Sequence, residues 1–117
     1  MKKHTYRSCA VNFPVFSNYE MRVSVTSDFR KALNANPQTK KVETDDSDKA
    51  FCVHIADQAV TYIFLKPDAD PGTIAHECWH AVREMMKFVG ADDNETVAYH
   101  LGYLVKKVHK LVHRRKK

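Results

Sequence analysis

The sequence has little that belongs to a membrane-spanning or secreted protein. Its most apolar stretch, AVTYIFL at 59–65, is far shorter than the roughly 20 residues that a transmembrane helix needs. The first residues, MKKHTYRSCAVNFPVF, include two lysines but no apolar segment, so we expect no signal peptide. The three cysteines are odd in number and form no CxxC pair, which argues against a disulfide framework. We therefore expect a cytoplasmic protein with reduced thiols and no membrane contact.

Acidic residues are absent from one end of the chain. Residues 106–117 hold seven of the 19 basic residues, so the first 105 residues carry 12 basic and 14 acidic ones. The net charge of +5 therefore belongs to this end. We expect residues 1–105 to form a single domain and residues 106–117 to be the basic, solvated end of its last helix. The alternative for this basic tail is weak contact with nucleic-acid phosphates or with an acidic partner.

Four apolar segments predict the strands of a packed domain, for which 117 residues with 44% hydrophobic residues suffice. These segments lie at 6–13, 19–25, 51–56 and 60–65. The last two are apolar at nearly every position, so we expect a hairpin in the middle of the sheet, with one face under helices. A short helix that begins after Asp28 and ends near Ala35 should separate the two pairs.

Two longer helices are expected to complete the chain. Asp70 is a suitable N-cap and Pro71 suits the first helical position. We expect this helix to end near Val89, because Gly90 is suited to the position just after the end of a helix. A second helix should open at 92–94 and continue into the basic tail. The order β-β-α-β-β-α-α predicts an α+β domain. We expect a small antiparallel or mixed sheet of about four strands, packed by these two helices.

The segment HECWH, residues 76–80, is the strongest indication of function. His76 and His80 are one turn apart on one helix face, so their imidazoles can occupy two adjacent corners of a tetrahedral Zn²⁺ site. Glu77 lies about a quarter turn further round, where it can take a proton from a zinc-bound water and pass it to a leaving amine. We expect Glu77 to be the catalytic base and acid. The alternative is a pair of surface histidines on an amphipathic helix.

A catalytic zinc site needs a third protein ligand and an open fourth position. Glu95 stands at the start of the last helix, on one stripe with the small residues Ala98 and Gly102, which would allow the helices to approach closely. We therefore predict Glu95 as the third ligand. The alternatives are Asp92, Asp93 and His100 as ligands, or an ordinary acid that the helix dipole favours at the position of Glu95.

HECWH, followed through a glycine turn by ETVAYHLG, resembles the gluzincin metallopeptidases, and the short spacing is similar to their minimal members, the minigluzincins. Small HExxH proteins of bacteriophages and prophages are similar in the stretch E-x-x-A-Y-x-x-G. The resemblance covers roughly residues 50–105. It implies a zincin-like fold and a zinc ion held by His76, His80 and Glu95, with Glu77 as catalyst. For a phage-encoded chain it also implies the host cytoplasm.

The resemblance does not supply the residue that would stabilise the oxyanion. Tyr99 and Tyr103 are candidates for this role, and the alternative for both is packing in the core or at an interface. His54, on an apolar strand, is expected to be a hydrogen-bonded core histidine. Within these 117 residues we expect no second lobe that would form a deep cleft.

Three functions of different classes remain open. The first is a zinc-dependent peptidase, a hydrolase with a narrow protein or peptide substrate, and an intact Glu77 favours it. The second is a catalytically weak or inactive peptidase-like module that binds a protein or nucleic-acid partner. The third is a metal-dependent hydrolase that acts on something other than peptides. Two iron-containing alternatives are disfavoured. A di-iron bundle needs four long helices and a second E-x-x-H, and this sequence has neither. An iron oxygenase site of two histidines and one carboxylate does not require Glu77 beside a ligand, whereas hydrolysis does.

Overall fold

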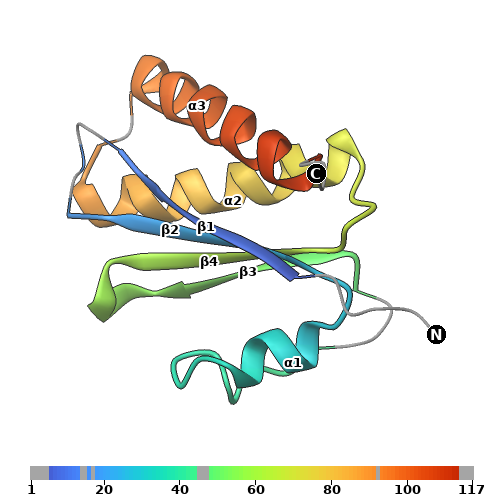
Figure 1. The fold of residues 1–117 in the computed structure, drawn as a ribbon. Coiled ribbons are helices and arrows are strands. Elements are labelled where there is room, and N and C mark those ends of the chain that lie inside the picture. Colours follow the sequence, from blue (N-terminus) through green and yellow to red (C-terminus); the bar gives the residue numbers. More distant parts are fainter. Residues whose placement is uncertain (1–5, 14–15, 17, 45–47, 92, 114–117) are drawn as a thin grey trace.

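The computed structural model describes residues 6–13, 16, 18–44, 48–91 and 93–113. A four-stranded sheet lies between two helical layers (Figure 1). Across the sheet the strands follow one another as β1 (Tyr6–Asn12), β2 (Glu20–Thr26), β4 (Val60–Leu65) and β3 (Ala50–Ile55). The pairs β1–β2 and β3–β4 are antiparallel, whereas β2 and β4 run parallel. The sheet is therefore mixed, and the predicted α+β class and order of elements are confirmed.

Helices cover both faces of this sheet. In Figure 1, α2 (Pro71–Val89) and α3 (Asn94–Val112) lie on one face of the sheet, and α1 (Phe29–Asn34) lies on the opposite face. A three-residue 3₁₀ turn, Ala56–Gln58, joins β3 to β4. The main core lies between the sheet and the α2–α3 layer, and a smaller apolar cluster lies under α1. The expectation that only one face is under helices is therefore wrong.

The two apolar strands of the predicted hairpin occupy different places. β4 is central: Ile63 and Leu65 belong to the core under α2, whereas Tyr62 and Phe64 belong to the cluster under α1. The prediction that β3 also lies in the middle is wrong, because β3 pairs only with β4 and forms an edge of the sheet. The side chains of β3 are apolar because helices pack on both faces of this strand. A central strand, which has a neighbouring strand on each side, can have the same composition, so composition alone does not distinguish an edge strand from a central one.

The ends of α2 and the start of α3 follow the predicted capping residues. The Asp70 carboxylate accepts a hydrogen bond from the backbone N–H of Thr73 at 2.7 Å, and Gly90 ends the helix with a φ of 76°. Only a residue without a Cβ adopts such a left-handed conformation at little cost. Asp93 caps α3 in the same way as Asp70 caps α2. These caps fix where α2 begins and therefore which of its turns faces β3.

The basic end of the chain is only partly solvated. Val108, Leu111 and Val112 of α3 are buried in the main core. Arg7 of β1 donates from its guanidinium to the backbone carbonyls of Leu111 and Val112, at 3.1 and 2.9 Å, and so caps the end of α3. The expected solvated tail is thus a helix with one packed face, and residues 114–117 lie outside the described part of the chain. Among the helices that are described, none is both long and apolar enough to span a membrane.

Candidate functional site

A groove of about 500 Å³ separates the edge strand β3 from helix α2. Within the described part of the chain, its lining comes from these two elements: Ala50, Phe51, Cys52 and His54 of β3, and His76, Glu77, His80 and Glu84 of α2. The helical residues recur at about one-turn intervals, so they share the face of α2 that is turned towards β3. The structure thus brings three of the predicted site residues together, namely His76, Glu77 and His80.

The imidazoles of His76 and His80 meet at the surface of the groove. Both residues are exposed, and their Nε2 atoms lie 3.2 Å apart. Two nitrogens held at roughly 2.0–2.1 Å from a tetrahedral zinc ion lie about 3.3–3.4 Å apart, so this pair fits two corners of a zinc site. The same distance also suits a hydrogen bond between two neutral imidazoles. Metal binding therefore needs only a small adjustment of the two rings.

Glu77 differs from the two histidines because it is buried, with 8% of its surface exposed. Its Oε1 atom and its backbone carbonyl oxygen each lie 3.3 Å from the Sγ atom of Cys52 on β3. An amphipathic helix places apolar side chains against a sheet, and a buried carboxylate costs free energy unless it is paired or hydrogen-bonded. The position of Glu77 is therefore poorly explained by packing and agrees with a chemical role.

Cys52 is a site residue that the sequence analysis missed. Burial raises the pKa of its thiol well above the ordinary value, and the nearby Glu77 carboxylate raises this pKa further. The thiol therefore keeps its proton at neutral pH and can donate a hydrogen bond to Glu77. Alternation along the strand could have placed Cys52 and His54 on one face. It could not have shown that this face is turned towards the HExxH helix.

His54 also lines the groove, and it is held from behind by two hydroxyl groups. Its Nδ1 atom lies 2.9 Å from the Tyr19 hydroxyl and 3.0 Å from the Thr61 hydroxyl. These two hydroxyl groups are themselves 2.5 Å apart. Burial raises the pKa of Tyr19, so its hydroxyl keeps its proton at neutral pH. The predicted hydrogen bonding of His54 is confirmed, but the residue lies at the edge of the groove as well as of the core.

Glu84 adds a second carboxylate to the groove, one turn of α2 beyond His80. Its Oε2 atom is 3.7 Å from Nε2 of His54, and its Oε1 atom is 3.6 Å from Nζ of Lys87. The described residues that line the groove include two glutamates and no lysine or arginine. This charge distribution favours the entry of a cation. The i+4 spacing from His80 could have indicated Glu84 in the sequence.

Glu95 does not line this groove. It is exposed in the first turn of α3, and α3 packs towards β1 and β2, whereas α2 packs towards β3 and β4. Val89, the last residue of α2, is nine positions after His80, which corresponds to a rise of roughly 13 Å before the chain turns back. Across the described ranges, no group of three or more His, Cys, Asp and Glu side chains is placed to hold a metal ion. The third ligand therefore stays a prediction.

Two of the three alternatives to Glu95, Asp93 and His100, form hydrogen bonds within α3 or at its cap. Asp93 accepts hydrogen bonds from the backbone N–H and the hydroxyl of Thr96, which lower the pKa of its carboxyl group. His100 is buried, and its Nδ1 atom lies 2.8 Å from the backbone carbonyl oxygen of Thr96. Asp92 lies outside the described residues. Tyr99, the weakest of the predicted site residues, is 63% exposed on α3 and does not line the groove.

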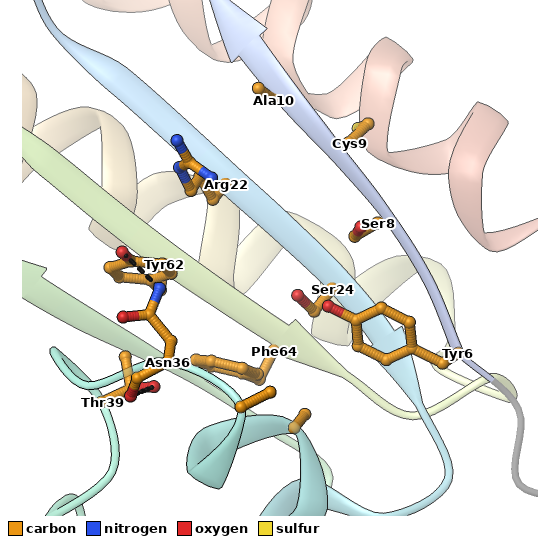
Figure 2. A pocket seen from close by; sticks show the side chains of 12 residues that line it. Tyr6, Ser8, Cys9, Ala10, Arg22, Ser24, Asn36, Thr39, Tyr62 and Phe64 are labelled. Carbon is orange, nitrogen blue, oxygen red and sulfur yellow. Dashed lines mark hydrogen bonds between the residues drawn. The ribbon is translucent and has the colours of Figure 1, made fainter.

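Two other cavities do not contain this set of residues. Figure 2 shows one of about 230 Å³ on the face of the sheet that carries α1, where Arg22, Ser24 and Tyr62 project. The described residues of its lining include no histidine and no acid. The other lies between β1 and α3, beside Tyr103 and Lys107, and its described lining likewise has neither a histidine nor an acid. Of these three grooves, only the one between β3 and α2 combines metal-binding imidazoles with carboxylates.

Comparisons with protein-family models, with curated proteins and with solved structures give no match to this chain.

Proposed function

We propose that this protein is a zinc-dependent peptidase of zincin-like fold, which hydrolyses a peptide bond in a narrow protein substrate. One observation carries the proposal: a buried glutamate, Glu77, lies in one groove with two exposed imidazoles whose Nε2 atoms are 3.2 Å apart. The resemblance of the HECWH segment to gluzincins supports the same reading. Zinc, when bound, polarises a carbonyl group and makes water a stronger nucleophile near neutral pH.

The residues of the chain have separate roles in this proposal. His76 and His80 hold the metal through their Nε2 atoms. Glu77 accepts a proton from the attacking water while the water oxygen bonds to the carbonyl carbon. Glu77 then gives this proton to the nitrogen atom as the carbon–nitrogen bond breaks, so it ends the reaction as it began. Cys52 keeps the Glu77 carboxylate in place through a hydrogen bond from its thiol group to Oε1 of Glu77.

A peptide is the substrate class that the groove suits best. β3 is an edge strand, so its outer backbone N–H and C=O groups are not paired within the sheet. An extended peptide can add to such an edge through main-chain hydrogen bonds. Its carbonyl groups would then pass along the groove that His76, Glu77 and His80 line.

A second candidate function also has a specific observation in its favour. The predicted third ligand, Glu95, is on α3 and not in the groove. A site with only two protein ligands would bind zinc weakly, and the protein could then be a peptidase-like module that binds a protein or nucleic-acid partner. The variant Glu95→Gln tests whether Glu95 is the third zinc ligand. A loss of zinc affinity in this variant would support Glu95 as a ligand. An unchanged affinity would leave the third ligand to another residue.

The test of the peptidase proposal is Glu77→Gln, which keeps the shape of the side chain and removes the base. We expect this variant to retain zinc and thermal stability while hydrolysis falls about 10²-fold or more. Because the substrate is not identified, the variant serves as a trap for host-lysate proteins, and each captured protein is then incubated with wild type. The matched control is Glu43→Gln, in the exposed loop after α1. If wild type and Glu77→Gln act identically on every captured protein, the peptidase proposal fails.

A further inference from the structure

Hydrolysis of a peptide bond places negative charge on the carbonyl oxygen, and a hydrogen-bond donor aimed at this oxygen lowers the barrier. The side chains that line the groove offer few donors. His76 and His80 are assigned to the metal, the two glutamates are acceptors when ionised, and the Cys52 thiol faces Glu77. Among the side chains that the structure describes in this lining, His54 is the donor that remains.

The hydrogen bonds behind His54 decide which of its ring nitrogens carries the proton. Nδ1, the Tyr19 hydroxyl and the Thr61 hydroxyl form a closed triangle, with distances of 2.9, 3.0 and 2.5 Å. If Nδ1 has no proton, Thr61 can donate to Tyr19 and Tyr19 to Nδ1, so every proton in the triangle has an acceptor. If Nδ1 has a proton, this proton occupies one contact to a hydroxyl oxygen, and the two hydroxyl protons are left with the single contact between Tyr19 and Thr61, so one of them has no acceptor in the triangle. The neutral ring therefore carries its proton on Nε2.

The Nε2 atom of His54 is turned towards Glu84, which lines the groove. It lies 3.7 Å from Oε2 of Glu84, which is longer than a hydrogen bond, and 22% of the His54 side chain is exposed. The Nε2–H group is thus near a carboxylate without being bound to it, and it is accessible to a molecule in the groove. Tyr19, which is fully buried, keeps the ring from turning away.

We propose that His54 is a further catalytic residue of this site, whose Nε2–H group donates a hydrogen bond to the carbonyl oxygen of the peptide bond that is cleaved. The hydrogen-bonded triangle of Tyr19, Thr61 and His54 holds the His54 ring in the groove that the HExxH residues of α2 also line. The inference rests on the proposed peptidase function. The sequence alone indicates an ordinary core histidine at this position.

The first measurement concerns the tautomer and needs no substrate. Long-range ¹H–¹⁵N spectra of wild-type protein with ¹⁵N-labelled histidine distinguish a protonated from an unprotonated ring nitrogen. We expect the neutral ring of His54 to have its proton on Nε2, with His54→Phe used to assign the signals. A proton on Nδ1 would overturn the inference, whether or not the protein is a peptidase.

The second measurement uses acetohydroxamate, a small zinc-binding molecule with a carbonyl oxygen, on the zinc-loaded protein. We expect His54→Phe to keep its zinc and to bind acetohydroxamate at least about tenfold more weakly than wild type, because one donor to the bound oxygen is lost. His109→Phe, on α3, is the control and should bind as wild type does. Equal affinity in His54→Phe and wild type would overturn the role of His54 and leave the peptidase proposal intact. Failure of wild type to bind zinc would overturn both.

Discussion

Removal of the Tyr19 hydroxyl tests whether the triangle behind His54 contributes to the fold as well as to the site. Tyr19→Phe keeps the buried ring, which packs at 5.3 Å from the Phe88 ring, and removes the hydrogen bonds to His54 and Thr61. Each such bond contributes about 0.5–1.5 kcal/mol net. The remaining bond between His54 and Thr61, at 3.0 Å, means that neither residue is left without a partner. The expected loss of stability is therefore about 1–2 kcal/mol.

Urea denaturation followed by circular dichroism measures this loss as a lower midpoint with an unchanged slope. In a chain of this size, about 3–6 °C of melting temperature should be lost for each kcal/mol. Tyr99→Phe is the matched control because Tyr99 is 63% exposed, and its stability should stay within about 0.5 kcal/mol of wild type. If Tyr19→Phe loses no more stability than this control, the hydrogen-bonded triangle has been described wrongly.

Three further predictions concern the site, the basic tail and alkaline pH. Cys52→Val should lower the rate of hydrolysis about tenfold with zinc content unchanged, whereas Cys52→Ser, which keeps a hydrogen-bond donor, should hydrolyse nearly as fast as wild type. Equal rates in Cys52→Val and wild type would contradict the role of the thiol in positioning Glu77. Truncation before Lys107 removes three buried aliphatic residues and should abolish the cooperative unfolding transition, whereas removal of only the last four residues should preserve it. Burial raises the pKa of Cys78 to about 12, so Cys78 should contribute no pH dependence to stability below about pH 9 and should lower stability from there towards pH 12, because its thiol loses its proton first in the unfolded chain. Urea midpoints across this range should fall less steeply in Cys78→Ala.

Much of the fold could be predicted because local signals agree with the tertiary structure. Asp70, Gly90 and Asp93 act within one turn of their own position, so the limits of the helices follow from the sequence. The place of β3 could not be predicted in this way. An apolar strand covered by helices on both faces has the same composition as a central strand, and only long-range pairing distinguishes the two.

In the candidate site, too, the residues that are close in the sequence could be predicted, whereas those brought together by tertiary structure could not. His76, Glu77 and His80 are neighbours within two turns of one helix, so their arrangement follows from helical geometry. Cys52 and His54 come from a strand more than twenty residues earlier, and no local rule relates that strand to α2. The prediction for Glu95 assumed that α3 returns along the side of α2 that carries the histidines. In the structure α3 packs on the β1 and β2 side, where the core residues of α3 find apolar partners.

The central claim is that His76 and His80 hold a zinc ion, and metal analysis of purified protein tests it most directly. Wild type should contain about one zinc per chain, and His76→Ala/His80→Ala almost none, because a histidine site binds through both imidazoles. The control is His109→Ala/His113→Ala, which removes another pair at the same spacing on α3, and it should keep the zinc of wild type. Lower pH should release the metal, because the imidazoles must be unprotonated to bind it. Full zinc occupancy in His76→Ala/His80→Ala would contradict the account.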